Sequence, residues 1–283
     1  MIWLPFVATA LFTLSMLQRK QFLRESRLPF SDFFPSLLLL IAGMSLVAAP
    51  FDWSVDASRA TAPLTILLLV IVSVLGMLWF EHFYRAIREE SLSRFDFLAV
   101  LDPLVTIAFV SLLFPAERNV HVWAATSVAC VALYFGHKNH HAIQFDHGER
   151  NLLVGIGLSA VIVAIDRYLL TIYSPLAFNA IYMCGIALLF VLRYGWGSLQ
   201  AGYRLFLPLT LTAALIVANT ILFFYSYREL GVTVTTLVAL LQPVAIGFIA
   251  YFIYKEPVKP KLLLAGVVVL LAVLYAVLRV STR

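Results

Sequence analysis

The stretch VALLQPVAIGFIAYFIYKEP, residues 238–257, carries a glutamine and a proline in the middle of an otherwise apolar run. The stretch AVLDPLVTIAFVSLLFPAE, residues 99–117, repeats this arrangement 140 residues earlier, with aspartate in place of the glutamine. Because proline lacks a backbone N–H and crowds the preceding helical turn, each Xaa-Pro pair predicts a kinked helix. Two kinks at matching places suggest a chain built from two related halves.

The composition indicates an integral membrane protein. Of the 283 residues, 62% are hydrophobic and 12% are charged, whereas about 25% of the residues of a soluble domain are charged. The net charge of +5 fits Lys and Arg gathered in cytoplasmic loops, so we expect no nucleic-acid partner. The two cysteines, Cys130 and Cys184, lie in apolar stretches and predict no disulfide framework.

Ten apolar runs are long enough to cross a bilayer, which takes about 20 residues. They occupy roughly residues 2–17, 33–50, 62–80, 95–114, 119–136, 152–172, 175–192, 204–224, 231–253 and 261–279. The runs are continuous rather than alternating, so helices are expected and not the strands of a barrel. The predicted fold class is therefore an all-α, multi-pass protein of the cytoplasmic (inner) membrane, surrounded by lipid bilayer.

The basic residues between these runs predict an orientation. Fourteen of them lie in the connections after the odd-numbered runs, and six lie on the opposite side. Because Lys and Arg concentrate in cytoplasmic loops, this distribution predicts that both termini lie outside the cytoplasm.

An internal repeat links the two halves of the chain. Aligning Asp102-Pro103 with Gln242-Pro243 also aligns Phe83 with Phe223, Arg88-Glu89 with Arg228-Glu229, and Leu101 with Leu241. Earlier in each half, LQRKQFL (17–23) resembles IDRYLLT (165–171). We therefore expect a first five-helix repeat at 1–140, a His-containing linker at 141–151 and a second five-helix repeat at 152–283.

Five spans per repeat place the second half upside down relative to the first. Inverted repeats of this kind are typical of secondary transporters, which bind substrate near the membrane midplane between the halves.

The second half resembles the EamA-type branch of the drug/metabolite transporter superfamily, through AIDRYLLTIYSPLAFNAIY (164–182) and LVALLQPVAIGFIAYFIYKEPVKPKLLLAGVVVLLAVLYAV (237–277). The shared pattern is a late span with a proline, an acidic residue at its end (Glu256), and a glycine in the final span (Gly266). The resemblance implies ten helices in two inverted repeats, with helices three, four, eight and nine around a central cavity. It also implies alternating access, small polar metabolites as substrates, and termini inside the cytoplasm, which is opposite to the charge distribution.

Ionisable groups at membrane depth are costly, so they are candidates for substrate binding or ion coupling. Glu81, next to His82, aligns with Ile221 inside a span. An apolar setting favours the protonated form of a carboxyl group, which suits a proton-coupling residue. The structural alternative is an interfacial pair at a helix end.

Asp102 and Gln242 lie beside the two prolines, where a kink frees backbone carbonyls that need polar partners. The aspartate could bind a cation or a proton and the glutamine could bind substrate, or both could only repair the backbone. Asp166 precedes Arg167 in a span, but neighbours on a helix point about 100° apart, so the two need not pair. Asp166 could therefore either face the cavity or serve a structural role.

Asn219 lies in mid-span and aligns with Trp79. An amide at that depth either bonds to another helix or faces the cavity. Trp79, Tyr84 and Tyr225 could form aromatic walls or anchor the helices at the membrane interface. The segment 137–150 holds four histidines without fixed ligand spacing, so we expect neither a metal site nor another cofactor.

These observations predict a secondary carrier of a small polar or amphipathic metabolite, such as an amino acid or a related compound. We found no nucleotide-binding motif, so coupling to protons or another ion, or exchange, is expected in place of ATP. We do not expect an enzyme. Two alternatives remain open: a lipid-carrier flippase, which would need basic groups at membrane depth, and an intramembrane enzyme, which would need clustered His, Asp or Cys.

Overall fold

The computed structural model describes residues 2–26, 30–89, 100–137, 147–195, 206–245 and 260–281, and these are almost entirely helical. The long helices of the first half are α1 (Leu4–Ser26), α2 (Phe30–Ala48), α4 (Pro63–Glu89), α6 (Leu101–Leu113) and α7 (Val120–His137). Those of the second half are α8 (His147–Leu169), α9 (Pro175–Tyr194), α10 (Phe206–Leu230), α11 (Val232–Ala239) and α13 (Pro260–Ser281). Short turns η1 (Ala49–Asp52), α3 (Ala57–Ala60) and η2 (Pro115–Glu117) lie between them.

These helices confirm the all-α class, and each of the ten predicted apolar runs overlaps one of them. Among the described residues, five helices are long and apolar enough to cross a membrane, and shorter apolar helices accompany them. The five spans are Phe34–Asp52, Pro63–Ile87, His147–Leu169, Pro175–Tyr194 and Phe206–Leu230. The total of ten spans stays a prediction.

Several helices run past the predicted ends of the apolar runs. α1 continues to Ser26 and α4 to Glu89, so the basic residues that follow the apolar part of α1 are helical. Backbone hydrogen bonding continues where a helix leaves the apolar region, because helical residues satisfy their own N–H and C=O groups in water as well as in lipid. Glu81 consequently lies inside α4 and not in a loop.

The predicted kink at Gln242-Pro243 coincides with a break in the helical hydrogen bonding, and at Asp102-Pro103 the described residues begin just before the pair, at Val100. α6 begins at Leu101, so Pro103 lies in its first turn, where no intrahelical acceptor needs its missing N–H. α11 ends at Ala239, and the N–H groups of Leu240 and Leu241 bond three residues back, at 3.1 and 3.0 Å. Helical structure resumes at Gln242. Each proline therefore starts a new helical segment, which is a position that tolerates it.

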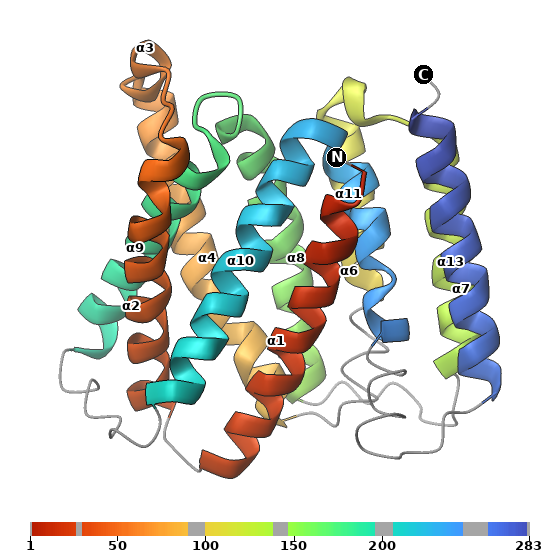
Figure 1. Ribbon diagram of the computed structural model, residues 1–283, viewed down its shortest axis with the longest axis horizontal. Helices are drawn as coiled ribbons and strands as arrows, with labels where there is room; N and C mark the ends of the chain where they lie inside the picture. Colours follow the sequence, from red (N-terminus) through yellow and green to blue (C-terminus); the bar gives the residue numbers. More distant parts are fainter. Residues whose placement is uncertain are drawn as a thin grey trace.

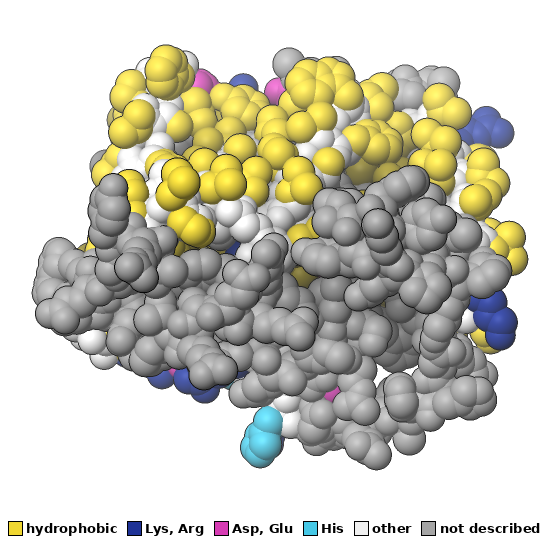
Figure 2. All heavy atoms as spheres, turned by 60° about the horizontal axis from the view of Figure 1, so that its bottom comes forward, with side chains coloured by type: hydrophobic (Ala, Val, Ile, Leu, Met, Phe, Trp, Pro, Cys, Tyr) yellow, Lys and Arg dark blue, Asp and Glu magenta, His cyan; other side chains and the backbone are white. Residues whose placement is uncertain are grey.

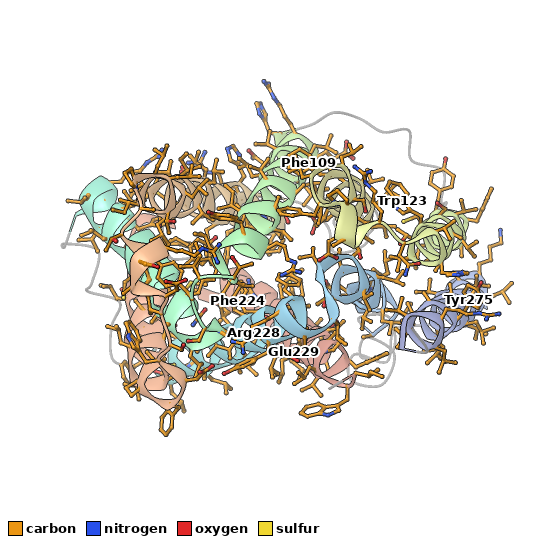
Figure 3. The ribbon with its side chains drawn as sticks, turned by 90° about the horizontal axis from the view of Figure 1, so that it is seen from above. Phe109, Trp123, Phe224, Arg228, Glu229 and Tyr275 are labelled. Carbon is orange, nitrogen blue, oxygen red and sulfur yellow. The ribbon has the colours of Figure 1, made fainter. Side chains whose placement is uncertain are left out.

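The helices pack in pairs that join the two halves. α4 packs on α8, α1 on α10, α2 on α9 and α7 on α13. Figures 1 and 3 both show α7 and α13 side by side at one edge, next to the larger group of helices. The main apolar core lies in that larger group, and a second core joins α7 and α13 to α11.

Two glycines allow α4 and α9 to approach closely. A methyl group at Gly76 would lie 2.5 Å from the Tyr182 hydroxyl, and one at Gly185 would lie 2.5 Å from Ser73 Oγ. Small residues at helix contacts are typical of membrane proteins, whose helices are held together mainly by close packing.

The start of α1, the end of α13 and the turn α3 lie at one end of the molecule (Figure 1), which we call the terminus face. Large apolar side chains cover much of the described outer surface (Figure 2). They include Leu64 and Leu67 on α4 and Leu188 and Leu192 on α9. Lipid hydrocarbon suits such a surface, whereas water does not.

Candidate substrate cavity

A cavity of about 230 Å³ lies between helices of both halves. Its described walls come from α4, α6, α8, α10 and α11, with one residue from α1 and two from α9. Figure 3 looks down from the terminus face and shows Phe224 of α10, one of the lining residues, among the helices of the larger group. Helices three, four, eight and nine of the expected carrier correspond to α4, α6, α10 and α11, and all four border this cavity.

Five of the eight residues that we predicted as site candidates line the cavity. They are Trp79, Asp102, Asp166, Asn219 and Gln242. Glu81, Tyr84 and Tyr225 are not among its lining residues.

Two carboxyl groups enter the cavity from neighbouring helices, Asp102 from α6 and Asp166 from α8. The Oδ1 atom of each is buried and has no hydrogen-bond partner. The hydroxyl groups of Thr106 and Ser159 lie beside the Asp102 carboxyl group. Asp166 itself is only 3% exposed. The cavity thus holds two acidic side chains with unused acceptor atoms.

The described lining contains no Lys, Arg or His. Arg167, which follows Asp166, bonds to Glu117 instead, at 2.9 Å. This agrees with the prediction that the adjacent Asp166 and Arg167 need not pair.

An amide group lies in the same cavity. Asn219 accepts a hydrogen bond from Thr220 Oγ1 at 3.2 Å, while its own Nδ2 is buried without a partner. Unpartnered buried polar atoms cost free energy unless a ligand or water satisfies them. The cavity therefore offers one free N–H donor group beside its free acceptors.

Aromatic rings form a large part of the walls. The rings of Trp79 and Phe83 on α4 stack with centroids 4.6 Å apart, and Phe223 and Tyr227 on α10 lie 6.2 Å apart. Phe12 of α1 meets Phe223 edge-on at 6.3 Å. Of these five rings only Trp79 was a predicted site residue, although the repeat had already aligned Phe83 with Phe223.

Glu81 of α4 belongs to an ion-pair network. Its buried carboxylate bonds to Arg85 on the same helix and to Arg193 Nη1 at 3.2 Å, and the Tyr194 hydroxyl donates to it at 3.1 Å. The neighbouring His82 Nδ1 lies 2.9 Å from Asn151 Oδ1 of α8. Glu81 is therefore a paired group, as in its structural alternative, but it lies inside α4 and not at the helix end.

Tyr84 and Tyr225 also hold elements together away from the cavity. Tyr84 is buried edge-on against Phe34, with ring centroids 4.3 Å apart, and the Arg19 guanidinium lies 5.4 Å from its ring. The Tyr225 hydroxyl donates to Asp52 Oδ2 at 2.6 Å, which ties α10 to the turn after α2.

A second buried carboxylate, Glu117, joins the halves at the terminus face. It accepts hydrogen bonds from Arg167 Nε at 2.9 Å, from the N–H groups of Val232 and Thr233 at 3.2 Å each, and from Thr233 Oγ1 at 3.1 Å. A negative charge is favourable at the N-terminus of a helix such as α11. Gly231 has φ +86°, and a methyl group there would lie 2.7 Å from Glu117 Oε2. We call this arrangement the Glu117 clamp.

Sequence reasoning missed the Glu117 clamp, although a signal was present. Glu117 ends the first Xaa-Pro stretch much as Glu256 ends the second. Glu256 itself, and residues 138–146 of the His-rich segment, lie outside the described residues.

Comparison with known protein families finds a match for the second half of the chain. Residues 151–278 match the EamA-like transporter family, which confirms the resemblance that the sequence motifs indicated. No curated protein sequence matches the chain. Among solved structures 28 chains match. One, described as "Crystal structure of protein", shares 14% identity with a TM-score of 0.72, over 99% of this chain and 96% of that chain. At 14% sequence identity, this structural similarity shows the fold alone.

Proposed function

We propose, from the premise that residues 151–278 are an EamA-like transporter unit, that this multi-pass membrane protein is a secondary transporter. It moves a small polar or amphipathic metabolite across the cytoplasmic membrane by alternating access between two inverted five-helix repeats. The observation that carries the proposal is the cavity, which both halves line and which holds unpartnered polar atoms. The described lining lacks the basic groups that a lipid-carrier flippase would need.

The helix contacts support the inverted repeat. The repeat alignment equates α1 with α8, α2 with α9, α4 with α10, and α7 with α13. If each helix is replaced by its counterpart in the other half, the contact between α4 and α8 becomes the contact between α10 and α1. In the same way, the contact between α2 and α10 becomes the contact between α9 and α4. All four contacts are present. The α2–α9 and α7–α13 contacts map onto themselves. A two-fold relation between the halves produces this pattern.

Proton coupling is assigned to Asp102. Of the two carboxyl groups that the sequence offered for coupling, Asp102 lines the cavity beside a helix boundary, whereas Glu81 is neutralised by two arginines. A cavity carboxyl group that exchanges a proton as the halves move can link substrate movement to a proton gradient.

The substrate and the coupling are tested together. A ligand-induced thermal-shift screen over amino acids, nucleosides, sugars and amines identifies solutes that stabilise the purified chain, and proteoliposomes then measure their uptake. Asp102→Asn is expected to abolish uptake driven by a proton gradient while sparing solute exchange measured at a saturating solute concentration. Unchanged gradient dependence in this variant would refute the assignment, and chemical turnover of the solute without translocation would refute a transport function.

A further inference from the structure

We infer that the cavity binds a protonated amine with an apolar or aromatic body and no acidic group, held by Asp102 and Asp166. This inference rests on the proposed transport function, because it names the substrate class of the same cavity.

The two carboxyl groups differ in their partners from two other buried acids, Glu81 and Glu117. Glu81 has Arg85 and Arg193, and Glu117 has Arg167. Asp102 and Asp166 each have an unpartnered buried oxygen, and no basic residue stands among the described lining. Buried acids are usually paired because an isolated charge is costly away from water. A cationic ligand would supply the pairing that the chain itself does not.

The aromatic walls favour an organic cation over a metal ion. Ammonium groups are attracted to the faces of aromatic rings, with Trp as the strongest partner, and Trp79, Phe83 and Tyr227 line the cavity. Among the described residues, no group of three or more His, Cys, Asp or Glu could hold a metal ion. Two carboxyl groups with aromatic surroundings suit a single ammonium group attached to an apolar body.

The lining also disfavours ligands that carry an acid. A carboxylate or phosphate would meet Asp102 and Asp166, with only the neutral Asn219 Nδ2 group and Thr236 hydroxyl as unpartnered donors among the described lining. The cavity of about 230 Å³ is below the range of about 300–1,000 Å³ that drug-sized ligands occupy, so a small amine is expected.

The test uses three probes that share a phenyl ring and differ in charge: phenethylamine, phenylalanine and 3-phenylpropanoate. Isothermal titration on the full chain in detergent at neutral pH is expected to give the highest affinity for phenethylamine. Phenylalanine should bind more weakly, and 3-phenylpropanoate should not bind measurably. This comparison needs no variant, so it does not depend on how substitutions affect folding.

Two variants then test the residues. Asp166→Asn and Asp102→Asn are each expected to weaken phenethylamine binding by about tenfold or more, since losing one partner of a buried charge pair costs at least that much. Glu229→Gln, which removes an exposed carboxylate on α10, should leave the affinity within about twofold. Figure 3 labels Glu229 beside Arg228.

Three results would overturn the inference: no binding of phenethylamine, equal binding of 3-phenylpropanoate, or unchanged phenethylamine affinity in both aspartate variants. Uptake assays in proteoliposomes distinguish a failure of the amine inference from a failure of the proposed transport function. Uptake of phenylalanine or 3-phenylpropanoate without uptake of phenethylamine would leave transport standing and remove the amine. If no solute of the thermal-shift screen were moved, the transport function would fall as well.

Discussion

Glu81 is a buried carboxylate whose charge is compensated at close range, by Arg85 and by Arg193 of α9. Both arginine side chains are nearly half exposed, so water already solvates part of each guanidinium group. Replacing Glu81 with glutamine removes the ion pairs but retains an oxygen that can accept the Tyr194 hydroxyl. The consequence is a weakened contact between α4 and α9 and not a change in the cavity.

We therefore predict that Glu81→Gln lowers the free energy of unfolding by about 1–2 kcal/mol, as expected for partly screened hydrogen bonds to a charged group. Thermal unfolding followed by tryptophan fluorescence measures the change in stability. Proton-driven uptake should persist in this variant, with Asp102→Asn as the comparison that loses it. Loss of gradient coupling in Glu81→Gln at unchanged stability would show that Glu81 is the coupling residue.

At the scale of single residues, sequence reasoning worked where a residue's position on its own helix decided its surroundings. Asp102 and Gln242 were selected because each stands beside a proline that was expected to kink its helix, and Asn219 because it lies in mid-span. It did not distinguish Trp79, which lines the cavity, from Tyr84 and Tyr225, which do not. The partners that place the two tyrosines, Arg19 and Asp52, come from other helices and turns. No local pattern predicts such contacts.

At the scale of elements, the Glu117 clamp joins η2 of the first half to α8 and α11 of the second. Glu117→Gln would leave the Arg167 guanidinium without its acid partner and weaken the cap of α11. The Arg167 side chain is 26% exposed, so water offsets part of the loss, and we predict a decrease of about 2–4 kcal/mol in the free energy of unfolding.

The matched control for the clamp is Glu229→Gln, which removes the carboxylate of the exposed Arg228–Glu229 pair at 3.8 Å. An exposed ion pair contributes about 0–1 kcal/mol, so its melting temperature should stay close to that of the unmodified chain. Equal melting temperatures of the two variants would contradict the role of the clamp.

The contact between α4 and α9 gives a second prediction at this scale. In Gly76→Ala the new methyl group would lie 2.5 Å from the Tyr182 hydroxyl and 2.7 Å from Ile186 Cδ1. Either the helices separate or Tyr182, which lines the cavity, is displaced. We expect a loss of about 1–3 kcal/mol in stability from overpacking, together with weaker ligand binding.

Gly157→Ala is the matched control, because a methyl group there meets nothing within 4 Å. Alanine is favoured over glycine inside a helix by about 0.5–1 kcal/mol, so this variant should be slightly more stable than the unmodified chain. Thermal unfolding measures the stability of the Gly76→Ala and Gly157→Ala variants. A Gly76→Ala protein as stable as Gly157→Ala would contradict the close approach of α4 and α9.

The helices themselves were predictable from the sequence because apolar length alone determines which segments suit a bilayer. The helix ends and the two breaks were less predictable. A proline is compatible with a kink inside a helix or with the first turn of a new one. Before Gln242-Pro243 the helical hydrogen bonding is interrupted at Leu240 and Leu241, which pack on the core shared by α7, α11 and α13, and such long-range contacts are not visible in the local sequence.

For the whole molecule, the 14-to-6 distribution of basic residues along the sequence leads to a prediction about orientation. Arg59 follows α2 at the terminus face, whereas Lys261 begins α13 at the opposite end (Figure 1). Because the richer face is expected in the cytoplasm, the terminus face should lie outside. With Cys130 and Cys184 replaced by alanine, Ala57→Cys should react with a membrane-impermeant maleimide in intact cells, and Lys261→Cys only after permeabilisation. The reverse labelling would establish the orientation that the family resemblance implies and would show that the charge distribution does not set the orientation of this chain.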